Sequence, residues 1–241
     1  MPGVIVDLRD GPKEKVPEVR NAYRFLRGAH NSVQGIVNAS QALAEQRRNA
    51  NSTTTGRPAS EEVDLLRSAL VMASSGIDAS MQRIIWDAGR YLIPKAGTAA
   101  RLQYEAHLKQ ALSGKNNVDD GLRNAIIGAE PRDGLLEYYL ATKTRASFQG
   151  SGDLKKRVRG TLGVPHASIS DSSLESLDPF FTARNKIAHA MDYQRPDEPG
   201  RTKRIHRSVD EVTAMCNNAL AVSADLLHAV ADVIIAARRV K

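Results

Sequence analysis

Cysteine is almost absent from this sequence, because its 241 residues include only Cys216. A single cysteine excludes an intramolecular disulfide framework and a zinc site built from cysteines. Its position in a predicted helix favours a buried structural thiol. No run of apolar residues reaches the length that we expect of a membrane span. The N-terminal MPGVIVDLRDGPKEK also has too short an apolar stretch for a secretion signal. We therefore expect a cytoplasmic protein that does not associate with membranes.

Aromatic residues make up only 5% of the chain, and patterns typical of β-strands are nearly absent. Lysine and arginine number 34 against 27 aspartates and glutamates, which gives a formal net charge of +7. Such an excess favours an anionic partner such as nucleic acid, although an ordinary basic surface has the same composition.

Apolar residues recur at helical spacing along most of the chain. One long helix is predicted from Pro17 to about Arg48, and a second from a capping Ser60 until Pro94. Shorter helices are predicted between residues 97 and 164, and a last helix opens at Ser208 with Glu211 in capping-box spacing. We predict an all-α helical bundle with residues 1–50 as an N-terminal helical extension, 51–59 as a linker or loop, and 60–241 as the main domain.

The segment LDPFFTARNKIAHAMDY, residues 177–193, carries the most informative pattern. Asp178 suits a helix cap and Pro179 suits the first helical position. At about 100° per residue, one stripe is predicted to face the core, made of Phe180, Ala183, Ile187, Ala190 and Met191. Asn185 and His189 then lie on the opposite face, one turn apart, with Arg184 beside them. An arginine followed by a histidine at similar spacing occurs at five places in the chain, so it is the helical setting that distinguishes this match.

Three stretches of the chain resemble the HEPN superfamily, whose all-helical domains include many bacterial toxin and defence ribonucleases. RNKIAH at 184–189 is similar to the superfamily's signature. DLLRSALVMASSGIDASMQRII at 64–85 resembles the first long helix of the branch called RiboL-PSP-HEPN, and RASFQGSGDLKKRVRGTLGV at 145–164 resembles the segment before its motif helix. The resemblance covers roughly residues 60–240 and implies a helical bundle of HEPN type.

The function that the resemblance implies is metal-independent RNA cleavage, with no cofactor. Histidine transfers protons near neutral pH, and arginine binds phosphate oxygens. His189 is therefore expected to act as general acid or base, Arg184 to hold the phosphate, and Asn185 to orient the substrate or the histidine. The resemblance also implies a homodimer in which two motif helices form one site, and an antitoxin or another defence-system protein is a candidate partner. Members regulated by nucleotide transfer carry a tyrosine two residues beyond the histidine, where this chain has Met191, so that regulation is not expected.

Two carboxylates are further candidates for the site. Asp178 either caps its helix or supplies an additional acid. Asp78 aligns with an acidic residue common in the resembled family, and a surface or capping carboxylate is the alternative interpretation.

Two groups of basic residues are candidates for binding RNA. The first lies on a predicted helix and the second in the loop QRPDEPGRTKRIHR, residues 194–207. A solvated basic face is the alternative for the first group. The candidates are Lys155, Lys156, Arg157, Arg159, Arg195, Arg201, Lys203, Arg204 and Arg207.

Two other functions remain open from the sequence. A noncatalytic helical dimer that binds RNA or protein would use Arg184 and His189 at an interface. A metal-dependent hydrolase is a weaker alternative, because no predicted helix carries histidines and carboxylates at coordinating spacing, so no metal site is expected.

Overall fold

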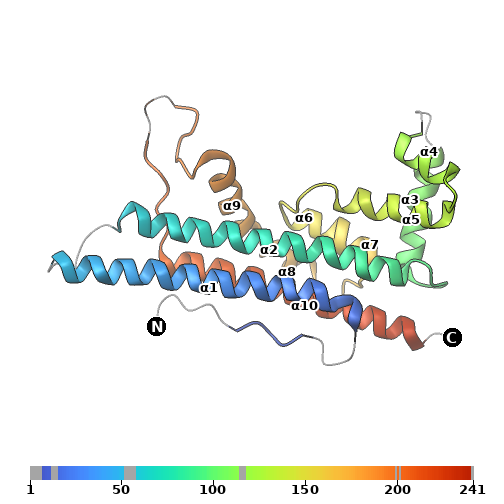
Figure 1. The fold of residues 1–241 in the computed structure, drawn as a ribbon, viewed down its shortest axis with the longest axis horizontal. Coiled ribbons are helices and arrows are strands. Elements are labelled where there is room, and N and C mark those ends of the chain that lie inside the picture. Colours follow the sequence, from blue (N-terminus) through green and yellow to red (C-terminus); the bar gives the residue numbers. More distant parts are fainter. Residues whose placement is uncertain are drawn as a thin grey trace.

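The computed structural model describes residues 7–11, 16–51, 58–113, 118–198, 200 and 202–239, and these residues form an all-α fold (Figure 1). The elements are α1 (Pro17–Asn51), α2 (Ser60–Leu92), α3 (Ala99–Ser113), α4 (Asp120–Ile127), α5 (Pro131–Thr144), α6 (Ser151–Asp153), the π-helical segment η1 (Leu154–Arg159), α7 (Gly160–Leu162), α8 (Asp171–Glu175), α9 (Asp178–Ala190) and α10 (Val209–Arg239). Within the described ranges, the nearest approach to a sheet is an isolated antiparallel bridge between Tyr193 and Arg204. The predicted all-α class is confirmed.

Helices α1, α2 and α10 are the three long elements of the fold, and they pack against one another (Figure 1). The apolar stripe of α1, including Val19, Leu26 and Val33, is fully buried and belongs to the same core cluster as the stripes of α2 and α10. The N-terminal helix is therefore docked along the bundle. Most of the loop predicted at 51–59 lies outside the described residues.

Helices α1 and α2 approach each other closely at Gly76. A Cβ added to Gly76 would lie 2.1 Å from Ala29 Cβ, so only glycine fits there. The hydrogen bonds from Ser40 Oγ to Glu62 O at 2.9 Å and from Asn21 Nδ2 to Asp87 Oδ2 at 3.4 Å show that the two helices are antiparallel.

Helix α10 is long and apolar enough to cross a membrane by length and composition alone, with a mean hydropathy of 1.8 in its most apolar 18 residues. The expectation that no such run exists was wrong. In the fold, α10 is a core helix that buries Val212, Leu220, Leu227 and Ile234. It also buries Cys216, as expected, and burial raises the pKa of this thiol to about 12. Core helices pass the same composition test, so α10 is weak evidence for a membrane span.

Helix starts agree only partly with the predicted caps. Ala59, not Ser60, is the N-cap of α2 and makes no side-chain capping bond. At Ser208 the predicted cap is present, because Glu211 N donates to Ser208 Oγ at 3.1 Å. In a full capping box, the Glu211 side chain would accept from the backbone N of Ser208. Here Glu211 instead forms an ion pair with Arg207 at 2.7 Å.

Candidate functional site

Helix α9 carries the RNKIAH motif and lies against α2 (Figure 1). It buries Phe180, Ala183 and Ile187 as expected, and also Phe181, which the predicted stripe omitted. Met191 is not part of the core: it is 59% exposed and has a positive φ of 49°, which ends the helix at Ala190. The stripe prediction failed there because it assumed that the helix continues for one more residue.

Arg184 faces α2, Asn185 is half-buried beside it, and His189 is exposed. Five residues of helix rotate the position of Arg184 by about 140° from that of His189. The half-buried Arg184 side chain donates from Nε to Ser74 Oγ on α2 at 2.9 Å and from Nη1 to Asn185 Oδ1 at 2.8 Å. The sequence predicted that Arg184 lies beside Asn185 and His189. Its backbone position instead faces α2, and only its long side chain contacts Asn185.

Asn185 connects the motif helix to the segment before α6. Its Nδ2 donates to Gln149 O at 3.4 Å, while its Oδ1 accepts from Arg184. His189, one turn further along α9, is exposed, and no hydrogen bond of its ring is found among the described residues. The result is a fixed arginine–asparagine pair with an accessible imidazole one turn away.

Asp178 does not cap its own helix, because the N-cap of α9 is Leu177 and no side-chain capping bond is present. Its carboxylate instead accepts from the backbone N and the Oγ of Ser151, both at 3.0 Å. Asp178 thus holds the start of α6 against the start of α9, which accounts for this carboxylate without a catalytic role.

Asp78 also holds the segment that precedes α6. Its Oδ1 accepts from Phe148 N at 2.7 Å and its Oδ2 accepts from Gln82 Nε2 at 2.8 Å. Asp78 lies one turn along α2 from Ser74, so neighbouring positions of α2 fix both Arg184 and the chain that reaches Asn185.

The first basic group mostly makes contacts within the chain. Arg159 is buried and pairs with Asp171 at 2.6 Å, and Lys155 pairs with Glu175. Arg157 donates to Lys143 O at the end of α5 and to Ser147 O beyond it, and its guanidinium lies 4.0 Å from the centroid of the Phe148 ring. Only Lys156 is exposed with no ion pair among the described residues. The three partnered side chains are poor candidates for RNA binding.

The second basic group also contains residues that are engaged within the chain and residues that are exposed. Arg207 is buried, and Arg204 donates to Met191 O at 2.9 Å and pairs with Asp64 at 2.7 Å. Arg195 pairs with Glu198 at 3.0 Å on an exposed surface, and Lys203 is exposed. Arg201 lies outside the described residues.

A buried ion network directly follows the motif helix, and no pattern in the sequence predicts it. Asp192 is 0% exposed and has a φ of 62°. Its carboxylate accepts from Arg67 Nε at 3.0 Å and from Arg207 Nε at 3.1 Å and Nη2 at 3.0 Å. Burial alone would lower the pKa of Arg207, but hydrogen bonds to Asp192 and Glu211 raise it above the ordinary value. The network ties the end of α9 to α2 and α10.

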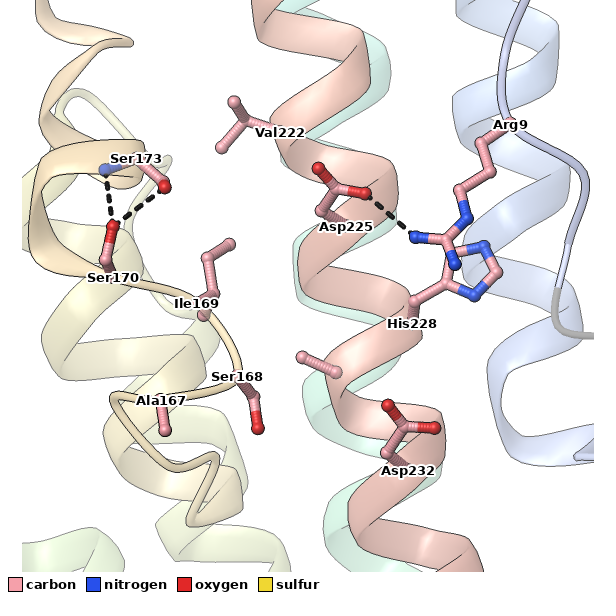
Figure 2. A pocket seen from close by; sticks show the side chains of 11 residues that line it. Arg9, Ala167, Ser168, Ile169, Ser170, Ser173, Val222, Asp225, His228 and Asp232 are labelled. Carbon is pink, nitrogen blue, oxygen red and sulfur yellow. Dashed lines mark hydrogen bonds and ion pairs between the residues drawn. The ribbon is translucent and has the colours of Figure 1, made fainter.

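A cleft of about 540 Å³ lies elsewhere, between α10 and the loop that precedes α8 (Figure 2). Arg9 and Asp225 form an exposed ion pair at 3.2 Å on its rim, and the His228 ring contacts Asp10 O at 2.8 Å. None of the predicted site residues lines this cleft. Within the described part of the chain, no group of three or more His, Cys, Asp or Glu residues is arranged to hold a metal ion.

No family model, no curated protein and no solved structure matches this chain.

Proposed function

We propose that this protein is a metal-independent endoribonuclease of toxin or antiviral-defence type, related to the HEPN ribonucleases that its sequence resembles. The observation that carries the proposal is the arrangement on α9: Arg184 is held by Ser74 and Asn185, and an exposed His189 follows one turn later. An arginine fixed through two of its nitrogens is preorganised to bind a phosphate with its remaining N–H groups. An exposed imidazole is free to transfer protons.

In the proposed reaction, the ribose 2′-oxygen attacks the adjacent phosphorus and the bond from phosphorus to the 5′-oxygen breaks. The attacking hydroxyl loses a proton and the leaving oxygen gains one, so the products end in a 2′,3′-cyclic phosphate and a 5′-hydroxyl. His189 transfers one of these protons, and Arg184 stabilises the charge that develops on the phosphate. The corresponding His189 of a second protomer, with two α9 helices facing each other, supplies the second proton transfer.

Few of the basic candidates have side chains that are exposed and available to bind the RNA backbone. Of the nine basic candidates, Lys156 and Lys203 are exposed without an ion pair among the described residues, and Arg195 has only a surface partner. Lys186 is a further exposed cation, on the motif helix itself, and lies one turn before His189.

The test is a cleavage assay on single-stranded RNA, with and without excess EDTA, comparing wild type, His189→Ala, Arg184→Ala and His166→Ala. His166 is a matched control because its side chain is exposed and lies outside both the motif and the candidate RNA-binding residues. We expect wild type and His166→Ala to cut equally, and the two motif variants to lose at least about 100-fold in rate. Cleavage that is lost in EDTA, or equal cleavage by all four proteins, would refute the proposal.

A noncatalytic binding module is the second candidate, and one observation favours it. Arg184 uses two of its three nitrogens in contacts within the chain, as expected for an arginine that stabilises the docking of α9 on α2. Under this alternative, wild type binds RNA or a partner protein without cleaving it, and Arg184→Ala lowers the free energy of unfolding while His189→Ala does not.

A further inference from the structure

The outer surface of α1 carries a row of arginines without ion-pair partners. Arg20, Arg24 and Arg27 follow one another at spacings of four and three residues, which makes them neighbours on the helix, and all three are exposed. No carboxylate among the described residues pairs with them, whereas Arg83 and Arg101 each pair with a carboxylate one turn away. Like charges at these spacings lower helix stability, so the stability of α1 does not explain the row.

The sequence of α1 places no acidic residue near the row. Residues 19–44 contain no aspartate and no glutamate. The guanidinium of Arg27 lies over the Tyr23 ring, 5.2 Å from its centroid, and this contact uses the flat face of the guanidinium. The N–H groups of the three arginines therefore remain available to an acceptor from outside the chain.

Two exposed asparagines extend the same surface toward the C-terminal end of α1. Asn31 Oδ1 lies 3.2 Å from His30 Nδ1, and Asn38 Oδ1 accepts from Gln34 Nε2 at 2.6 Å. Because each amide oxygen has a partner on the helix, the Nδ2 group of each asparagine remains as a donor. At 1.5 Å per residue, the surface extends over about 27 Å from Arg20 to Asn38. We call this surface the donor face of α1; it consists of Arg20, Arg24, Arg27, Asn31 and Asn38.

The donor face points away from the motif helix. Ala29 marks the side of α1 that meets α2 at Gly76, and the donors lie about 140–180° around α1 from Ala29. On α2, Gly76 and Ser74 are two residues apart, so they lie on sides of the helix about 160° apart. Ser74 contacts Arg184 of α9. Helices α1 and α9 therefore lie on opposite sides of α2 (Figure 1), with axes about 20 Å apart.

We propose that the donor face of α1 binds the phosphate backbone of a folded RNA that extends from there to the motif helix. Arginine and asparagine side chains contact phosphates without reading the base sequence. A row of cations along one helix matches a negative charge that repeats along a strand. The donor face has no large apolar residue, whereas the centres of protein–protein interfaces are enriched in aromatic residues and methionine. These features favour RNA over an acidic protein.

The folded form of the RNA rests on the proposed function. An RNA that is cut at His189 and held on the far side of α1 has to pass around two helices. A short single strand in the candidate site does not reach the donor face, whereas a long folded RNA spans both. Helix α1 precedes the part of the chain that resembles the HEPN superfamily, so the donor face adds a contact that the resemblance does not imply.

Binding is tested in a His189→Ala background, where no RNA is cut, by fluorescence anisotropy of a labelled hairpin RNA and of a single-stranded hexanucleotide. The α1 variant carries Arg20→Gln, Arg24→Gln and Arg27→Gln. The control variant removes the same charge from exposed positions on and after α4 and α5, with Arg123→Gln, Arg132→Gln and Arg145→Gln. Glutamine has nearly the helix propensity of arginine, so both variants should fold.

The α1 variant should bind the hairpin at least about 10-fold more weakly than its parent, and the slope of log affinity against log salt concentration should fall by about 3, one for each phosphate contact. The control variant should bind the hairpin like the parent, and all three proteins should bind the hexanucleotide equally. Unchanged hairpin binding by the α1 variant, or equal weakening by the control variant, would overturn the proposal. It is also overturned if the parent binds polyglutamate more tightly than the hairpin and the α1 variant loses that binding, because the partner is then an acidic protein.

Cleavage assays with His189 intact separate this proposal from the proposed function. The α1 variant should cut the hairpin with a raised KM and an unchanged kcat, and should cut the hexanucleotide like wild type. If wild type cuts no RNA while the α1 variant binds the hairpin more weakly than the control variant, the proposed function fails and RNA binding by the donor face stands. If wild type cuts the hairpin and the α1 variant does so with unchanged KM, the proposed function stands and the donor face is not used.

Discussion

The ion network after the motif helix gives a quantitative prediction for Asp192→Asn. Asparagine keeps the size of the side chain and tolerates the left-handed backbone that residue 192 adopts, with a φ of 62°. The substitution therefore removes the negative charge while leaving the backbone unchanged. Arg67 and Arg207, residues that are each 5% exposed, then lose the buried carboxylate that they share.

The expected loss in the free energy of unfolding depends on the carboxylate partner that each arginine keeps. Removing one partner from a buried ion pair typically costs about 3–5 kcal/mol, because a buried charge is left uncompensated. Arg67 still has Asp64 at 2.7 Å, and Arg207 still has Glu211 at 2.7 Å. Both remaining carboxylates are more exposed than Asp192, so they compensate only in part. We expect a loss of about 3 kcal/mol in the free energy of unfolding, near the lower limit of that range.

Urea denaturation followed by circular dichroism measures this loss. Asp225→Asn is the matched control, because its ion pair with Arg9 joins side chains that are 64% and 55% exposed, and such pairs contribute less than about 1 kcal/mol. If Asp192→Asn costs no more than Asp225→Asn, the network does not hold the end of α9 as described.

Two further predictions concern the core. Gly76→Ala should lower the free energy of unfolding by about 1–3 kcal/mol, because its Cβ would meet Ala29 Cβ at 2.1 Å and the helices must separate; an unchanged melting temperature would contradict this contact. Cys216, with a pKa raised to about 12, should not react with Ellman's reagent at pH 8 until the protein is denatured, and rapid reaction of the native protein would show that it is not buried. Because the folded pKa is the higher one, this thiol has no effect on stability below about pH 8.5 and lowers stability as pH rises toward 12.

Helical periodicity predicted α1, α2, α9 and α10 well, because each buries one stripe of apolar residues against the same core. The predictions that were wrong concern the ends of helices and the partners of polar side chains. Met191 leaves the core because the backbone turns left-handed there, and Asp178 bonds to Ser151 on a different element. The first depends on where the helix ends, which apolar spacing does not give, and the second depends on a segment that is distant in sequence.

The sequence by itself determined that the chain is helical, that its thiol is internal, and that Asn185 and His189 lie one turn apart on the side of α9 away from its apolar stripe, because these properties follow from local periodicity. Only the tertiary structure decided that Arg184 turns toward Ser74, that Arg157, Arg159 and Arg207 are engaged within the chain, and that Asp192 is buried. The physical reason is that a long charged side chain pairs with whichever carboxylate or carbonyl the packed helices bring within reach. The sequence gives the charges, and the packing of the helices gives their partners.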